Sequence, residues 1–172
     1  MTIEYHKLDN DKQVFFYEQE FYMFSNFSAF RLKWQGMDFD TSEHAYHFLK
    51  FDYPTSLAPD EDAREALIIV RRNIRHAISA HEAFKVAERN KKLRRPDWYE
   101  VKSEVMIGLL RAKVQQHEYV RRKLLETGDR ELIEDSWRDD YWGWGPDRQG
   151  QNVLGRLWMR VREELRNGDI DY

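Results

Sequence analysis

The sequence predicts a single, mainly helical α+β domain with a small β-sheet at its N-terminal end. Two β-prone runs, Val14–Tyr17 and Phe30–Trp34, lie among turn-like stretches before residue 40, where Gly36 is the clearest break. Beyond that point the apolar residues recur mainly at the three- and four-residue spacing of amphipathic helices. A length of 172 residues and a hydrophobic content of 41% suit one globular domain, which we expect to span residues 1–172.

Local signals place the helices along the chain. The predicted helices cover about 42–52, 61–73, 79–90, 97–113, 117–126, 129–135 and 152–166, with a loop at 53–60. Thr41 supplies N-cap chemistry for the first helix. Asp97 and Glu100 have the spacing of a capping box at the start of the longest one. Asn152 can cap the last helix, which ends near Gly168.

The composition excludes a disordered chain and several enzyme classes. Aromatic residues make up 15% of a chain that is 34% charged, and so many rings can bury enough apolar area to offset the entropy cost of ordering. Cysteine is absent, which rules out disulfides, thiolate nucleophiles and Cys-ligated zinc or iron–sulfur sites. No stretch approaches the roughly 20 apolar residues that cross a bilayer, and the N-terminus lacks an apolar signal segment. We therefore expect a cytoplasmic protein without a membrane partner.

The net charge of −3 conceals a basic segment. Residues 64–124 hold 16 Lys and Arg against 7 Asp and Glu, a net of +9, so the rest of the chain carries −12. Solvated helix faces explain any single charge, but an excess of this size favours an anionic partner that carries phosphate.

The first predicted helix carries the most informative group of side chains. Four polar residues share one face at helical spacing, which aligns a carboxylate, an imidazole and an amine. They are Glu43, Tyr46, His47 and Lys50. An ordinary solvated face explains the same spacing. His44 and His47 suggest a metal site only weakly, because no third ligand is obvious and the HExxH motif is absent.

A second group lies at the start of the longest predicted helix. Trp98 and Lys102 are four residues apart, so we expect a ring and an ammonium side by side. Arg94 and Arg95 are close in sequence. Such a group can hold a nucleobase by stacking and its phosphate by charge. A Trp that anchors the helix start to the core explains the pattern equally well.

Two further segments combine aromatic residues with small polar ones. The segment 139–145 contains Trp142 and Gly143 and lies ahead of a helix N-terminus, where backbone N–H groups can approach a phosphate. Phe24–Ser28 places Asn26 between rings. Structural turns that pack these rings explain both segments. GxGxxG, the Walker motif and Gly-x-Ser-x-Gly are all absent, so dinucleotide-fold, Walker-type and serine-nucleophile sites have no support.

Four motifs, in order, resemble the NADAR (YbiA-like) family over about residues 22–166. They are FSNFS at 24–28, TSEHAYHFLKF at 41–51, RRPDWYEVK at 94–102, and DDYWGWG followed by QNVLG within 139–155. The resemblance implies a compact, mainly helical α+β fold and hydrolysis of N-glycosidic bonds to ribose. Members of the family include an N-glycosidase that acts on ribosylaminopyrimidine intermediates of riboflavin synthesis, and enzymes that remove ADP-ribose from guanine bases.

The resemblance, together with the groups above, implies the site residues. The expected catalytic residues are Glu43, Lys50 and Asp139, and the expected substrate-binding residues are Asn26, Arg89, Arg95, Trp98, Lys102, Trp142 and Gly143. Glu43 would activate water or stabilise positive charge on the sugar, and Asp139 would orient the water or a ribose hydroxyl. Lys50 would either donate a proton to the leaving base or attack C1′ to form a Schiff base. The tryptophans would stack the base, and the arginines would hold phosphate.

We expect no metal and no redox cofactor for this reaction. The expected partner is a small ribosyl phosphate or an ADP-ribose-type molecule, and nucleic acid that carries ADP-ribosylated bases is a further expected substrate. One departure concerns substrate choice: after Glu43 and His44 the family often has an aromatic residue and a Gln-rich stretch, whereas this chain reads AYHFL at 45–49. The alternative is a module that binds ADP-ribose or NAD without cleaving it. A third hypothesis, nucleic-acid binding through residues 64–124, predicts steeply salt-dependent affinity for duplexes.

Overall fold

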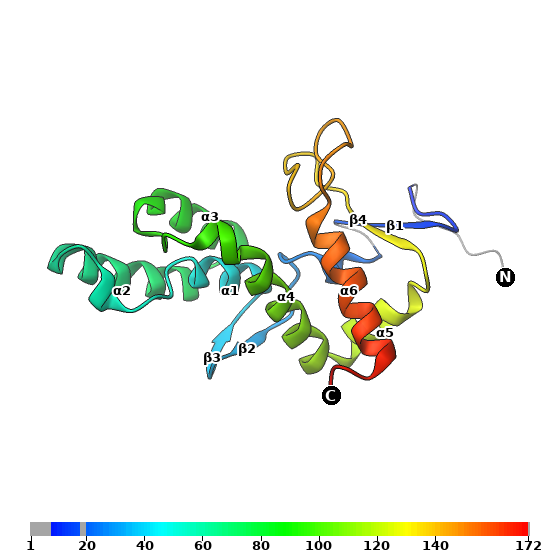
Figure 1. Cartoon of the computed structure of the whole chain (residues 1–172), viewed down its shortest axis with the longest axis horizontal. Coiled ribbons are helices and arrows are strands. Elements are labelled where there is room, and N and C mark those ends of the chain that lie inside the picture. The colour runs from blue at the N-terminus through cyan, green and yellow to red at the C-terminus, as the bar shows by residue number, and fades with distance from the viewer. Residues whose placement is uncertain (1–7, 18–19, 172) are drawn as a thin grey trace. The chain divides into compact units, whose positions relative to one another are not determined.

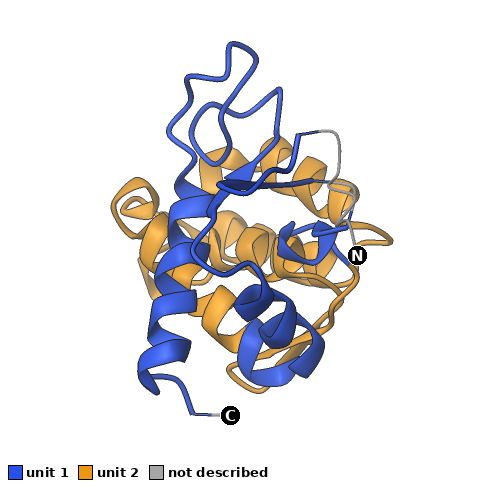
Figure 2. Ribbon diagram, turned by 90° about the vertical axis from the view of Figure 1, so that its right-hand side faces the viewer, with its two compact units in different colours: residues 1–28, 113–172 blue, residues 29–112 orange. Residues whose placement is uncertain are grey.

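The computed structural model describes residues 8–17 and 20–171. The chain divides into two compact units, residues 1–28 with 113–172 (unit 1) and residues 29–112 (unit 2) (Figure 2). Within the described ranges no helix combines the length and the apolar character needed to cross a bilayer.

The predicted mainly helical α+β class is confirmed. The elements shown in Figure 1 are β1 (Gln13–Phe16), β2 (Leu32–Trp34), β3 (Met37–Phe39), α1 (Ser42–Leu49), α2 (Glu61–Arg75), α3 (Ala80–Arg89), α4 (Trp98–Gln116), α5 (Glu118–Glu126), β4 (Glu131–Glu134) and α6 (Val153–Asn167). Short 3-10 turns lie at Tyr22–Phe24, Thr55–Leu57 and Lys91–Leu93. Helix α4 begins in unit 2, and its residues 113–116 belong to unit 1.

Unit 2 begins with a β-hairpin. Strands β2 and β3 pair antiparallel, with Leu32 opposite Phe39. The turn residues Gln35 and Gly36 have φ angles of 49° and 79°, the left-handed pair that defines a type I′ two-residue hairpin turn. Glycine adopts this conformation without steric strain, which explains Gly36 in the second position.

Helix α1 packs against α2 and α3 in the centre of unit 2. All eight of its residues are buried. Its predicted N-cap is confirmed, because the Thr41 side chain accepts a hydrogen bond from the backbone N–H of His44. Asp60 and Ser79 cap α2 and α3 in the same way. At the start of α4, by contrast, the Asp97 carboxylate that we expected in a capping box accepts hydrogen bonds from the Arg95 guanidinium.

Unit 1 contains a parallel pair of strands that the sequence did not predict. Residues 129–135 were expected to be helical, but 131–134 form β4, which pairs with β1 in the register Val14 to Leu132. A short apolar run such as Leu132–Ile133 fits a strand or a helix locally. Residues 131–134 form a strand because they pair with β1, which lies more than 110 residues away in the sequence.

Helix α6 lies very close to β4 at Gly155. A Cβ atom at this position would clash with the carbonyl oxygen of Leu132, so only glycine fits there. Asn152 occupies the N-cap position of α6 as predicted, but it has a left-handed φ of 49° and its side chain does not cap the helix. Its side chain instead donates to Leu132 O at 2.8 Å and accepts from the Glu134 N–H at 3.0 Å. Asn152 thus ties the helix start to the strand.

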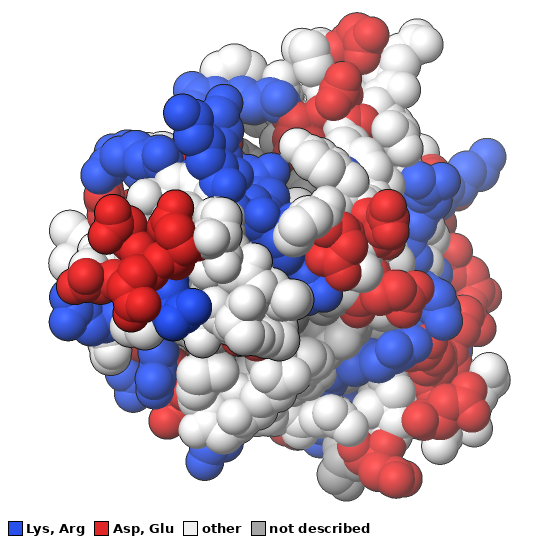
Figure 3. All heavy atoms as spheres, turned by 60° about the vertical axis from the view of Figure 1, so that its left-hand side comes forward, with Lys and Arg blue, Asp and Glu red and all other residues white. Residues whose placement is uncertain are grey.

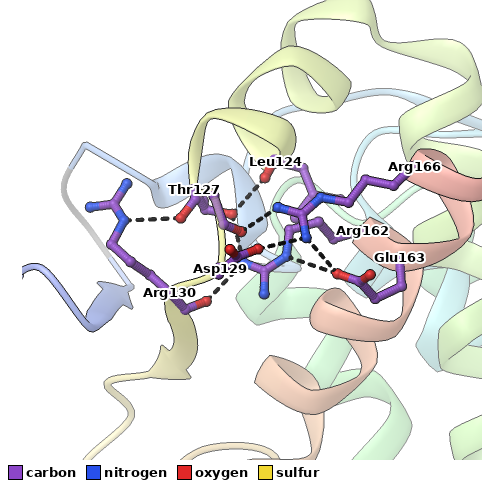
Figure 4. A network of polar contacts seen from close by, with 8 residues as sticks. Leu124, Thr127, Asp129, Arg130, Arg162, Glu163 and Arg166 are labelled. Carbon is purple, nitrogen blue, oxygen red and sulfur yellow. Dashed lines mark hydrogen bonds and ion pairs between the residues drawn. The ribbon is translucent and has the colours of Figure 1, made fainter.

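A buried arginine joins α6 to the turn between α5 and β4 (Figure 4). Arg162 is 4% exposed and donates to Thr127 Oγ1 at 2.9 Å and to the Arg130 carbonyl at 2.8 Å. Arg166, one turn later, donates to Asp129 and to Glu163. Both bonds of Arg162 come from Nη1 and fix the turn that precedes β4, while its Nε lies 3.9 Å from Glu163 Oε1 and has no hydrogen-bond partner among the described residues.

Candidate active site

The polar face of α1 is a buried group inside unit 2. Glu43, His47 and Lys50 are 9%, 2% and 6% exposed, respectively, and Tyr46 is buried beside them. The solvated-face explanation of their spacing is therefore wrong. Burying three ionisable side chains on one short helix is unfavourable unless they interact with one another or with neighbours.

Glu43 and His47 form the shortest contact of this group. His47 Nε2 lies 2.7 Å from Glu43 Oε1, as their i,i+4 spacing on the helix allows. Burial lowers the pKa of His47, while the neighbouring Glu43 carboxylate opposes that shift. A neutral ring with its proton on Nε2 donates to the carboxylate. The other ring nitrogen, Nδ1, has no hydrogen-bond partner among the described residues.

Lys50 lies in an aromatic and mixed-charge setting. Its Nζ is 5.0 Å from the centre of the Tyr46 ring, 5.9 Å from that of Trp98 and 3.8 Å from Glu88 Oε1. Burial lowers the pKa of Lys50 to about 8, and the charges of Arg94 and Lys102 act in the same direction, whereas Glu43 and Glu88 oppose the shift. Both the ammonium and the free amine are therefore available near neutral pH.

The segment around residue 94 closes this group. Arg94 donates to Glu88 Oε1 at 3.1 Å and to the Tyr99 hydroxyl at 3.3 Å. The backbone N–H of Arg95 donates to the carbonyl of Lys50 at 2.8 Å. These bonds connect the end of α1 with the segment that leads into α4.

Trp98 and Lys102 have different surroundings. Trp98 is 2% exposed and its ring packs against Tyr46, with ring centres 5.0 Å apart. Lys102 lies over the ring of Tyr99, 5.6 Å from its centre. The explanation in which Trp98 anchors the start of α4 in the core is thus confirmed, while base stacking by Trp98 and phosphate binding by Lys102 stay predictions.

The expected phosphate-binding arginines are both ion-paired. Arg89 donates to Glu82 at 2.9 Å, and Arg95 forms a two-bond pair with Asp97 at 2.6 and 2.8 Å. The acids of the basic segment therefore neutralise part of its charge locally. On the face drawn in Figure 3, Lys and Arg side chains nevertheless form a continuous area at the upper left, directly above an acidic group. Phosphate binding by Arg89 and Arg95 stays a prediction.

Asn26, Asp139, Trp142 and Gly143 belong to unit 1. Asn26 is buried in the turn 25–28. The Asp139 carboxylate accepts hydrogen bonds from the backbone N–H groups of Tyr141 and Trp142 at 2.9 and 2.8 Å. In the structure Asp139 thus shapes its own loop, and its part in catalysis stays a prediction, as do the binding roles of the other three.

The glycine-rich loop is a closely packed turn. A Cβ at Gly143 would be 2.8 Å from the Glu134 carbonyl oxygen, and one at Gly150 would be 2.7 Å from the Asp140 carbonyl oxygen. The N–H of Asn152 donates to the Gly143 carbonyl at 2.8 Å. A side chain at either position would clash with the backbone, so glycine is required there for packing of the loop.

The histidine pair of α1 does not form a metal site. His44 Nδ1 lies 2.8 Å from Thr41 Oγ1, and its Nε2 lies 3.1 Å from the Ala77 carbonyl oxygen, so both ring nitrogens are engaged. In the part of the chain that the structure describes, no group of three or more His, Asp and Glu residues could hold a metal ion.

Several residues of interest were missed by the sequence reasoning. Glu88 interacts with Lys50, and it could not be assigned to that site because it comes from α3, far along the chain. Lys113 is fully buried in unit 1, where its Nζ donates to the Ser25 carbonyl at 3.0 Å and to Ser28 Oγ at 2.8 Å. It therefore holds the turn that carries Asn26. The i,i+4 spacing of Glu43 and His47 was the one signal that could have revealed their direct contact.

Comparisons with known proteins agree with one another. The sequence profile of the NADAR domain matches residues 15–166. The N-glycosidase YbiA of Escherichia coli is 38% identical over 142 residues, which cover 83% of this chain and 80% of the relative. An N-glycosidase of Nostoc punctiforme is 35% identical over 156 residues, 90% of this chain and 93% of the relative. A riboflavin biosynthesis protein of Vibrio vulnificus is 34% identical over 157 residues. The match covers 90% of this chain but only 39% of the length of that relative.

A solved structure extends this similarity to the fold. The NMR structure of Escherichia coli YbiA matches with a TM-score of 0.75 at 34% identity, covering 99% of this chain and 94% of that one.

Proposed function

Because this chain belongs to the NADAR domain family, we propose that it is an N-glycosidase that hydrolyses the bond between C1′ of a ribose and a nitrogen of its base. Two relatives of similar length carry the name N-glycosidase. The observation that carries the proposal is the buried group on α1, in which the carboxylate of Glu43 and the amine of Lys50 share one helix face.

The bond to be broken explains why these two groups suit the reaction. As the C1′–N bond lengthens, positive charge develops on the sugar and negative charge on the departing base. The Glu43 carboxylate would stabilise the sugar cation or take a proton from the attacking water, whose oxygen bonds to C1′. The Lys50 ammonium would give its proton to the departing nitrogen.

A covalent route uses the same lysine in its other protonation state. The neutral Lys50 amine would attack C1′ and displace the base, and one proton from Nζ would go to the departing nitrogen. The C1′–O4′ bond would then break, with the second proton from Nζ passing to O4′, to leave a Schiff base on Nζ. Water would then hydrolyse that Schiff base and return the amine. With a pKa of about 8, about one Lys50 in ten is neutral at pH 7, so both routes have their reactive form present.

We further propose a phosphorylated ribosylaminopyrimidine as the substrate. The name of the Vibrio vulnificus relative points to riboflavin biosynthesis, and the basic residues of segment 64–124 favour a ligand that carries phosphate. Arg89, Arg95 and Lys102 are the proposed phosphate contacts in unit 2, with Trp98 as the proposed ring contact for the base. The roles of Asn26, Asp139, Trp142 and Gly143 in unit 1 are proposed from the motif resemblance.

A product assay tests the proposal. Catalytic amounts of protein are incubated with ribosylaminopyrimidine phosphate, NAD, ADP-ribose and ADP-ribosylated guanosine, and the released base is detected by mass. We expect multiple turnovers with the pyrimidine. Release from ADP-ribosylated guanosine alone would move the substrate to the ADP-ribose class. Binding of ADP-ribose or NAD without release of a base from any of the four would identify a binding module and overturn the proposal.

A further inference from the structure

We infer that His47 is a positioning residue that holds the Glu43 carboxylate in its reactive orientation. The inference rests on the proposed function of Glu43, but it concerns a different residue. Its basis is the 2.7 Å contact between His47 Nε2 and Glu43 Oε1, made by two buried side chains of α1.

The protonation of the ring follows from its surroundings. Burial lowers the pKa of His47 below its ordinary value of 6.5, so the imidazole is neutral at pH 7 and carries one N–H. A carboxylate only accepts hydrogen bonds, which places that proton on Nε2. Nδ1 is then an acceptor, consistent with its having no donor among the described residues. The ring therefore supplies Glu43 with one fixed donor.

The packing around the imidazole fixes its direction. Tyr46 and Phe84 meet the His47 ring edge to face, with ring centres 5.5 and 5.6 Å away. The His47 side chain is 2% exposed, whereas the side chain of Glu43 retains 11%. His47 thus supports the carboxylate from the protein side, and Glu43 keeps the accessible surface that a substrate or water needs.

Other charges act on the same pair. Lys50, one turn further along α1, and Glu88, from α3, both influence His47. Arg94 and Lys102 act on Lys50. Loss of the imidazole donor removes the hydrogen bond to Glu43 Oε1, and with it the contact that fixes the direction of the carboxylate.

Matched variants separate this role from packing. His47→Leu removes the donor and keeps an apolar side chain, and His47→Met serves the same purpose should the leucine variant fail to fold. His47→Gln restores an N–H donor. His44→Gln is the control, because His44 is a buried histidine of the same helix that contacts Thr41 and Ala77 instead.

The test measures the Glu43 carboxylate directly and needs no turnover. The protein is labelled with 13C at glutamate side-chain carboxyls, the Glu43 signal is assigned by its loss in Glu43→Gln, and its chemical shift at pH 7 is compared among the variants. We expect the signal to move in His47→Leu or His47→Met, because the hydrogen bond to Oε1 is lost, and to stay near the wild-type position in His47→Gln and His44→Gln. An unchanged signal in the donor-free variants, or an equal change in His47→Gln, would overturn the inference.

Turnover gives the second readout. In the donor-free variants kcat should fall while KM stays near the wild-type value, and kcat should return in His47→Gln. If the wild-type protein releases no base from any substrate, the proposed function fails, while the carboxylate signal still decides the role of His47.

Discussion

The lowered pKa of Lys50 is a prediction that can be measured without any substrate. An exposed lysine titrates near 10.5, whereas Lys50 is expected at about 8 because it is buried. At pH 7 this difference corresponds to a roughly 300-fold larger fraction of neutral amine. The excess amine is what makes attack on C1′ chemically reasonable.

The assay is an NMR titration of protein labelled at lysine Cε. The Lys50 signal is assigned by its loss in Lys50→Arg, and its midpoint is read against those of exposed lysines in the same spectra. Because Glu88 opposes the shift and Arg94 adds to it, Glu88→Gln should lower the midpoint and Arg94→Gln should raise it, each by roughly half a unit. A midpoint above about 10, or changes of the opposite sign in these variants, would refute the reasoning.

The same midpoint separates the two roles of Lys50. If the free amine attacks C1′, kcat rises with pH through about 8, because the fraction of amine grows. If the ammonium protonates the leaving base, kcat falls over the same range. A pH profile with no inflection near the Lys50 midpoint would remove the lysine from both steps.

Three further predictions concern stability. Burial lowers the pKa of Lys113 from 10.5 to about 7. Between these two pH values the lysine is neutral in the folded protein and charged in the unfolded one, so unfolding takes up a proton. The free energy of unfolding therefore rises with pH over this range, by at most about 1.4 kcal/mol per pH unit. Lys113→Met should remove this rise between pH 7 and 8 when the free energy of unfolding is measured by urea denaturation. An unchanged dependence of that free energy on pH would contradict the prediction. Gly155→Ala should cost about 3 kcal/mol of folding stability, because the new Cβ clashes with the Leu132 carbonyl oxygen. A loss below about 1 kcal/mol would be too small for that clash. Thr41→Ala should cost about 1 kcal/mol of folding stability through the lost cap of α1. Equal denaturation midpoints for the variant and the wild type would contradict a stabilising role of the cap.

Local sequence signals predicted the helices well because their causes are local. Apolar spacing, the caps at Thr41 and Gly168, and the break at Gly36 act within a few residues, and the corresponding elements are present. Strand β4 was predicted as a helix because its partner, β1, lies more than 110 residues away. Asn152 was predicted to cap α6, but its side chain bonds to that same strand. Both errors come from one long-range pairing.

The site was predictable to a similar extent. Helical spacing brought Glu43, His47 and Lys50 to one face, but it did not reveal that the face is buried, since burial depends on how α2 and α3 pack against α1. The effect of Glu88 on Lys50 depends on the same packing. Lys113 carried no local signal, because a lysine at the end of a helix ordinarily reaches solvent.

The Glu43→Gln variant is the most direct test of Glu43 as the group that supports cleavage of the C1′–N bond. The amide has nearly the shape of the carboxylate and keeps an oxygen that can accept from His47 Nε2. The measurement is kcat for release of the base, followed by mass, together with Kd of the same ligand by calorimetry. We expect kcat to fall about 1,000-fold or more while Kd stays within about threefold of the wild-type value. A kcat within about tenfold of wild type would contradict the assignment.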